Sequence, residues 1–295
     1  MISILGIVIV LSAIVGGYLI EHGKLLVLVQ PAELIIIFGA AVGTLVVANP
    51  VPNLMRILKG IAAIFSGSPF DKAYYTENLK MLYELFNYAR KNGTAKLEED
   101  LDNPAKSPVF SKYPKFLKSH HALDFLCDTL RMVVTGGVEP MEIDQMMEVD
   151  LEVHHRESEE PIAALTTMAD ALPGLGIVAA VLGVVITMGS LGGPKEEIGN
   201  HVAAALVGTF LGILLCYGIF SPLAGAMAKQ NDAEGHYFGF LRMAALAFVK
   251  GLSPIMAVEL ARRSIPTTVR PSFKEVEAAC RGSKAAAAAA PAAAA

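Results

Sequence analysis

The chain has 295 residues, of which 54% are hydrophobic and only 18% are charged, and its formal net charge is −4. This composition is too apolar for an ordinary soluble domain, and the sequence has no basic patch with interleaved aromatic residues, which argues against nucleic-acid binding. The three cysteines, Cys127, Cys216 and Cys280, are widely spaced and form no CxxC pair, so neither a disulfide framework nor a zinc site is predicted.

Four segments are long and apolar enough to cross about 30 Å of hydrocarbon, which takes roughly 20 helical residues. They cover residues 2–20, 32–51, 171–191 and 202–228. A cleaved signal peptide would have a basic start, whereas this chain begins Met-Ile-Ser-Ile, so we expect the first segment to be retained. The sequence predicts an all-α membrane protein with four transmembrane helices and a large helical cytoplasmic domain.

The positive charges predict the orientation. Thirteen Lys and Arg residues lie in 52–170 and nine follow residue 228, which leaves only Lys24 and Lys195 elsewhere. By the positive-inside rule, the long connection, the tail and both termini are expected on the cytoplasmic side. The expected divisions are a transmembrane hairpin at 1–51, a cytoplasmic domain at 52–170, a channel-forming hairpin at 171–228, a helical tail at 229–281 and an Ala-rich low-complexity tail at 282–295.

The long connection has the periodicity of packed helices. Apolar residues recur at helical spacing in two stripes. The first stripe is Tyr75, Leu79, Leu82, Phe86 and Ala89, and the second is Leu123, Leu126, Leu130 and Val133. Gly136 and Gly137 end the second helix, and Pro140 suits the first turn of a third. That third helix is strongly acidic and is expected to lead into the third membrane segment as a stalk, bent at Pro161.

The membrane segments have no ionisable residue near their middles. Glu33, Asp170 and His201 are expected only at the rims. Because a proton or sodium relay needs a buried titratable group, the sequence predicts that the chain conducts nothing by itself or that a partner supplies the carboxylate.

The third and fourth segments favour close packing, since they contain several glycines and the GxxxG at 208–212. Thr187 and Thr209 are expected at similar depths, about 6 and 10 Å from the outer ends at 1.5 Å per residue. Their hydroxyls could line a path or bond to their own helix backbone. Pro173 and Pro222 are expected near the same inner surface. Pro173 suits a helix start, whereas Pro222 predicts a kink.

The runs ALPGLGIVAAVLG at 171–183, GGP at 192–194, AAALVGTFLGI at 203–213 and QPAEL at 30–34 closely resemble the MotA family of flagellar stator subunits. This family is related to the TolQ and ExbB proton-channel proteins, and the resemblance covers nearly the whole chain. It implies a non-enzymatic stator subunit in the bacterial inner membrane, with no cofactor. It also implies five A subunits around two MotB-type B subunits, whose transmembrane aspartate carries the ion, a proton more than sodium.

The resemblance also implies roles for particular residues. Pro173 and Pro222 would couple protonation to movement of the cytoplasmic domain, and Ala180, Thr209 and Tyr217 would face the B-subunit helices. Thr187 is added as a polar lining candidate. Arg90 and Glu98 would contact the rotor protein FliG, with Asp150 as a further rotor-facing candidate. Without the resemblance, Arg90 and Glu98 would be interpreted as solvated surface charges.

Several alternatives remain open at the level of sequence. A TolQ- or ExbB-like energiser of outer-membrane processes is expected to have three spans. A small-molecule permease would need substrate ligands at mid-membrane, and a membrane scaffold would conduct nothing. The adjacent pairs His120–His121 and His154–His155 suggest a metal site, but neighbouring helical residues point about 100° apart, so neither pair is expected to bind one ion.

Overall fold

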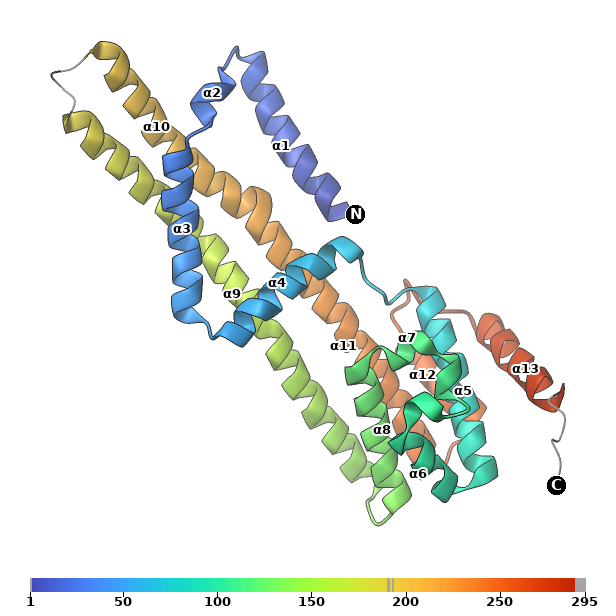
Figure 1. Cartoon of the computed structure of the whole chain (residues 1–295). Coiled ribbons are helices and arrows are strands. Elements are labelled where there is room, and N and C mark those ends of the chain that lie inside the picture. The colour runs from blue at the N-terminus through green and yellow to red at the C-terminus, as the bar shows by residue number, and fades with distance from the viewer. Residues whose placement is uncertain (1, 190–191, 193, 290–295) are drawn as a thin grey trace. The chain divides into compact units, whose positions relative to one another are not determined.

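The structure is a computed structural model that describes residues 2–189, 192 and 194–289. Every regular element among these residues is a helix, which confirms the predicted all-α fold (Figure 1). The helices are α1 Ile2–Ile20, α2 Leu25–Leu28, α3 Pro31–Ala48, α4 Val51–Ser66, α5 Lys72–Asn92, α6 Thr94–Asp102, the short turns η1 Pro104–Lys106 and η2 Phe110–Lys112, α7 Pro114–Leu117, α8 His120–Thr135, α9 Pro140–Gly189, α10 Lys195–Ile213, the π-helix η3 Leu214–Phe220, α11 Ser221–Val249, α12 Pro254–Ser264 and α13 Phe273–Ala289.

The chain divides into two compact units. The first unit is Met1–Ser68 with Arg156–Asn231, and the second unit is Pro69–His155 with Asp232–Ala295. The boundary falls inside the helices α9 and α11, so each of these helices contributes to both units. These units follow internal contacts and not the membrane, so the expected divisions after residues 51, 170 and 228 stay a prediction.

The first unit contains the apolar parts of four helices that are long enough to cross a membrane. In Figure 1, the paired helices α9 and α10 lie side by side. The helix α1 has the predicted bounds, and no residue of its apolar window 3–20 is buried within the chain. This helix therefore offers its surface to lipid or to other subunits.

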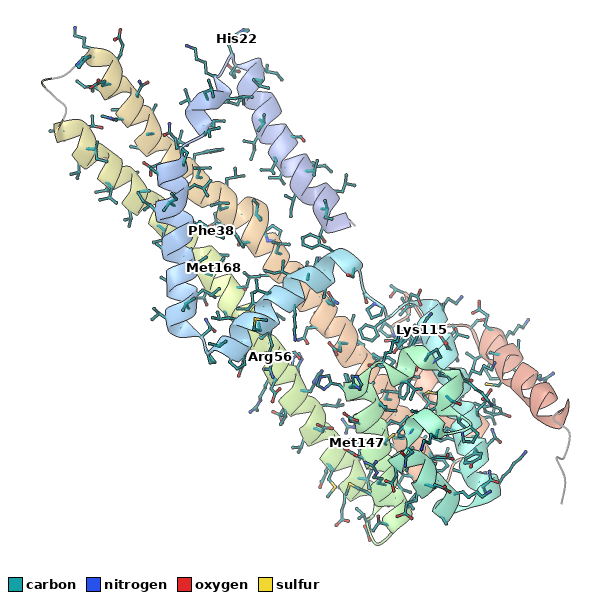
Figure 2. All side chains as sticks on the ribbon, in the orientation of Figure 1. His22, Phe38, Arg56, Lys115, Met147 and Met168 are labelled. Atoms are coloured by element: carbon teal, nitrogen blue, oxygen red, sulfur yellow. The ribbon has the colours of Figure 1, made fainter. Side chains whose placement is uncertain are left out.

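The second transmembrane segment ends three residues earlier than expected. Helix α3 stops at Ala48 because Asn49 precedes Pro50 and has extended backbone angles, as residues before proline prefer. The following helix α4 is amphipathic. It buries Ile57 and Ile64 in the core of the first unit and leaves Leu58 exposed. Figure 2 shows the position of Arg56 on this helix, where its guanidinium pairs with Glu157 at 3.1 Å.

The second unit is built around α5. The predicted stripe Tyr75, Leu79, Leu82, Phe86 and Ala89 is buried, and each large apolar side chain contributes about 1.5–3 kcal/mol on burial. The ring of Phe86 stacks on Phe248 of α11 with centroids 4.5 Å apart. The second predicted stripe is also confirmed on α8, where Leu126 and Leu130 are buried and Leu123 and Val133 pack against the same core.

Helix α9 begins at Pro140, as predicted, because Gly136 and Gly137 have positive φ angles of 76° and 84° and end the preceding helix. It continues without interruption to Gly189 and contains Pro161 and Pro173. The predicted continuity of the acidic helix with the third apolar segment is thus confirmed, and the bend at Pro161 stays a prediction. Within the second unit, Arg242 lies 2.7 Å from Asp144 and 3.4 Å from Glu148, and its hydrogen bond with Asp144 raises the pKa of Arg242.

Candidate functional site

Glycines form the contact between α9 and α10. A methyl group added at Gly212 would lie 2.6 Å from the carbonyl oxygen of Leu172, and one added at Gly176 would lie 2.9 Å from the carbonyl oxygen of Gly208. Closer to the loop, a methyl at Gly183 would lie 2.8 Å from the Cβ of Ala205. The predicted close packing is therefore present, and it fixes the register of the two helices.

This register corrects the expected depths of the two threonines. Gly183 faces Ala205, so Thr187 lies one turn further toward the loop, whereas Thr209 lies beside Gly176. The two hydroxyls are therefore separated by roughly 12–17 Å along the helices. The expectation failed because α10 begins at Lys195, seven residues before the predicted segment, with Glu196 and Glu197 stabilising its first turn.

The two threonines also differ in their environments. Thr187 is buried, and its hydroxyl donates to the carbonyl of Gly183 at 2.8 Å, which is the backbone bond that the sequence left open as an alternative. Thr209 is only partly buried. Thr209 is thus the better placed of the two to offer its hydroxyl to a partner.

The predicted partner-facing residues Ala180 and Tyr217 lie on these same helices. Ala180 is half-buried next to the Gly208 contact. Tyr217 is 69% exposed and belongs to the π-helix η3, where an aromatic side chain of this size is free to contact another chain or lipid. Both positions are compatible with the predicted role, which stays a prediction.

Pro173 lies inside α9 and does not begin a helix, which overturns that interpretation of it. A proline there removes one backbone hydrogen bond and clashes with the preceding turn. Pro222 lies two residues after the end of η3, and the N–H of the intervening Ser221, which caps η3, donates to the carbonyl of Cys216, five residues earlier. The wider π turn relieves the clash of a proline ring with the residue four positions before it. The irregularity predicted at Pro222 is therefore a π-helix.

The two prolines are not at the same level. Leu172 faces Gly212, and Pro222 lies ten residues further along the second helix, which corresponds to about 15 Å. Because the two helices run antiparallel, the residue of α9 opposite Pro222 lies ten residues before Leu172, at about residue 162. By the same count, η3 lies opposite the stretch of α9 between Pro161 and Pro173. The expectation of one shared inner surface is wrong, and the irregular features instead alternate between the two helices.

The carboxyl group of Glu33 does not lie at the rim of its segment, where it was expected from the sequence. Glu33 belongs to the first turn of α3, but the residue is only 6% exposed. A methyl added at Gly208 would lie 2.9 Å from Glu33 Oε2, 3.3 Å from Ala179 Cβ and 3.5 Å from the backbone nitrogen of Ala180. The carboxyl group therefore fills the space above Gly208, near the middle of the third apolar segment and not at its rim.

The sequence carried one signal for this position. A single carboxylate interrupts the otherwise uncharged segment 31–48, and such residues usually mark function. Elsewhere on α3, Phe38 stacks on Phe220 with ring centroids 6.0 Å apart, and Figure 2 shows Phe38 on this helix. These contacts hold α3 against the α10–η3 helix.

The predicted rotor-facing residues all belong to the second unit. Glu98 on α6 and Asp150 on α9 are exposed. Arg90 is also exposed, but its Nη2 donates to the backbone carbonyls of Gly251 at 2.7 Å and Leu252 at 3.1 Å. Arg90 is therefore held in place and is not merely a solvated charge.

The histidines form no metal centre in the described part of the chain. The rings of His121 and His154 have centroids 5.4 Å apart, and His154 Nε2 lies 3.6 Å from Glu234 Oε1. No group of three His, Cys, Asp or Glu side chains in the described ranges is arranged to hold an ion.

Comparison with known proteins places this geometry in context. The motility protein A N-terminal family matches residues 4–93, and the MotA/TolQ/ExbB proton channel family matches residues 118–238. Motility protein A of Escherichia coli is 39% identical over 96% of both chains, and that of Salmonella typhimurium is 38% identical over 94% of both. Chemotaxis protein LafT of Vibrio parahaemolyticus is 36% identical over 92% of this chain and 96% of its own.

Solved structures confirm the fold. The structure of C. jejuni MotAB superposes with a TM-score of 0.74 at 20% identity, over 92% of this chain and 98% of that one. The flagellar MotAB stator complex from Bacillus subtilis superposes with a TM-score of 0.71 at 21% identity, over 93% and 98%. The four apolar helices and the N-terminal family match disfavour the three-span alternative. This chain belongs to the motility protein A family, the flagellar stator subunits of the MotA/TolQ/ExbB proton channel family.

Proposed function

We propose that this chain assembles with a MotB-type B subunit into a proton-conducting stator that exerts force on the rotor protein FliG. The B subunit supplies the transmembrane aspartate that carries the proton, and five A subunits surround two B subunits. Protons are favoured over sodium because the whole-chain pattern resembles the proton-driven members of the family. The two related solved structures, both named MotAB, support this partnership.

The observation that carries the proposal is the arrangement of irregular features along α9, α10 and η3. Pro161 and Pro173 lie inside α9 and each lack the backbone N–H that would donate within the helix, and the π-helix η3 lies just before Pro222 on the facing helix. Such features localise bending in otherwise regular helices. Because α9 and α11 each contribute to both units, a change of bend in the first unit can be passed along these helices.

The energy available is sufficient for such a change. One elementary charge that crosses 100 mV releases about 2.3 kcal/mol. This amount shifts the populations of two helix arrangements whose free energies differ by a few kcal/mol. Protonation of the partner aspartate beside Thr209 and Ala180 is the proposed trigger.

The proposed orientation places both termini and the second unit in the cytoplasm, in the inner membrane. It rests on the distribution of Lys and Arg, of which twenty-two of twenty-four lie in 52–170 and after residue 228. Arg90, Glu98 and Asp150 of the second unit would then face the rotor. Helix α1, which has no buried residue in its apolar window 3–20, supplies surface for neighbouring A subunits.

The proposal is tested by expressing the chain with a B subunit in a flagellated bacterium that lacks its own stator. We expect swimming to be restored by the pair and by neither subunit alone. Swimming that is not restored by the correctly inserted and co-purifying pair would contradict the proposal.

A further inference from the structure

The buried carboxyl group of Glu33 has no role in the proposed mechanism. Its Oε2 has no hydrogen-bond partner among the described residues, and 94% of the residue is removed from solvent within this single chain. It lies over Gly208, one residue before Thr209, where α3 meets the contact between α9 and α10. A polar group in this position is costly, so packing alone does not explain it.

The charge state of Glu33 follows from its surroundings. An ionised carboxylate in hydrocarbon costs several kcal/mol unless it is paired, so the resting form is the neutral acid. The elements of the first unit around α3 carry the following titratable groups: Lys195, Glu196, Glu197 and His201 on α10, Arg56 and Lys59 on α4, Cys216 and Tyr217 on η3, Lys24 before α2, and Arg156, Glu157, Glu159, Glu160 and Asp170 on α9. Glu160 lies beside Thr44 and Ala48, at the end of α3 remote from Glu33.

Among these groups, His201 indicates a route by which protons reach Glu33 from the outer side of the membrane. It lies on the same face of α10 as Ala205 and Gly208, two turns or about 10 Å nearer the outer loop. Its Nδ1 is also buried without a hydrogen-bond partner in the described part of the chain. Two protonatable side chains, His201 and Glu33, thus lie one after the other along the same face of α10, and each has a buried polar atom without a hydrogen-bond partner in the described part of the chain.

We propose that Glu33 is a proton-binding site of the A subunit itself, set in the wall of the pathway and filled from the outer side past His201. The inference rests on the proposed function. The Glu33 acid releases its proton toward the B-subunit aspartate, and the carboxylate that is left takes up a proton from the outer side, which regenerates the acid. A proton enters and a proton leaves, so no other reactant is needed.

Proton flux through membrane vesicles that contain the co-expressed A and B subunits tests this role. We expect Glu33→Gln, which keeps the shape and removes the titration, to lower the flux at least about tenfold, as loss of a proton-transferring group does. Glu33→Asp retains a carboxyl group and is expected to conduct at an intermediate rate. Glu197→Gln is the matched control, because Glu197 is exposed in the first turn of α10. It is expected to conduct normally.

An assembled Glu33→Gln complex that conducts like the unmodified one overturns the inference. If Glu33→Gln does not assemble, the proton flux of the Glu33→Asp complex is measured as a function of the pH outside the vesicles. A midpoint of this titration that differs from that of the unmodified complex supports proton binding by residue 33. An unchanged midpoint overturns the inference. An unmodified complex that does not conduct at all contradicts the proposed function as well, so the two failures are distinguishable.

Discussion

The guanidinium of Arg90 is bonded to the carbonyl oxygen of Gly251, with an Nη2 to oxygen distance of 2.7 Å. Gly251 has a φ angle of 77° and follows the end of α11, where helix carbonyls lack partners within the helix. The end of α5 is thereby tied to the end of α11. A substitution at Arg90 consequently changes the fold and the surface charge together.

Removal of this bond should destabilise the protein. We expect Arg90→Ala to lower the free energy of unfolding by about 1.5–3 kcal/mol, the usual contribution of a hydrogen bond to a charged group. Glu98→Ala is the control, because Glu98 is exposed and has no side-chain bond in the described part of the chain. Denaturant unfolding of the full chain in detergent measures both. Equal stability of the two variants would contradict the structural role of Arg90.

Glu98 is therefore the cleaner probe of rotor contact. Glu98→Lys is expected to reduce swimming without reducing stability, and a compensating charge on FliG should restore part of it. Arg90→Glu is expected to reduce swimming too, with a stability loss that no change on FliG repairs. Swimming assays across the charge swaps test this, and indifference to every swap would favour a merely solvated surface.

The close contact between α9 and α10 predicts that the cost of replacing glycine by alanine depends strongly on which glycine is replaced. Gly212→Ala places a methyl 2.6 Å from a backbone carbonyl oxygen, which cannot move aside as a side chain would. We expect a cost of about 1–3 kcal/mol and a lower yield of assembled complex. Gly174→Ala, on the same helix as Leu172 but with open space around the added methyl, is the matched control. Thermal stability of the purified complex compares them, and equal behaviour would contradict the contact.

Replacing either Pro173 or Pro222 by alanine should leave assembly intact and abolish torque. Alanine restores a backbone N–H and is favoured by about 3 kcal/mol over proline in a helix interior, so it favours a straighter, less bistable helix. Co-purification with the B subunit and swimming speed are the two measurements. Normal swimming by both variants would remove the proposed coupling.

The second unit should lose stability in acid through Glu259. Hydrogen bonds from Arg262, and then from Arg263, lower the pKa of Glu259 to about 2 from its ordinary value of 4.5, against an opposing effect of burial. Because the folded-state pKa is lowered, this stabilisation is present above the ordinary pKa and is lost as the pH falls toward the folded value. Glu259→Gln should therefore lower the melting temperature at neutral pH, and the difference should vanish by about pH 2. A constant difference across this range would contradict the pairing.

The sequence was sufficient for elements whose burial pattern is local. The stripe on α5, the glycines before Pro140 and the bounds of α1 follow from spacing and turn chemistry within a few residues. Charge counting also predicts which segments share a side of the membrane, and that orientation stays a prediction. These features need no knowledge of which helix faces which.

Features that depend on register between helices were not predictable in this way. The depth of Thr209 relative to Thr187 is set by contacts between residues far apart in the sequence, such as Gly183 with Ala205 and Gly176 with Gly208. The burial of Glu33 depends on a third helix that meets this pair, and η3 has no signature except the proline that follows it. The spacing of apolar residues shows which face of a helix is buried, but it does not show which other helix packs against that face.

Conduction is expected to require a carboxyl group from a second polypeptide. Proton flux should be measured in vesicles that contain this chain with a B subunit, once with its transmembrane aspartate and once with asparagine in its place. We expect flux only with the aspartate, even though Glu33 is present in both complexes. Equal flux from the asparagine complex, or flux from this chain alone, would contradict the account.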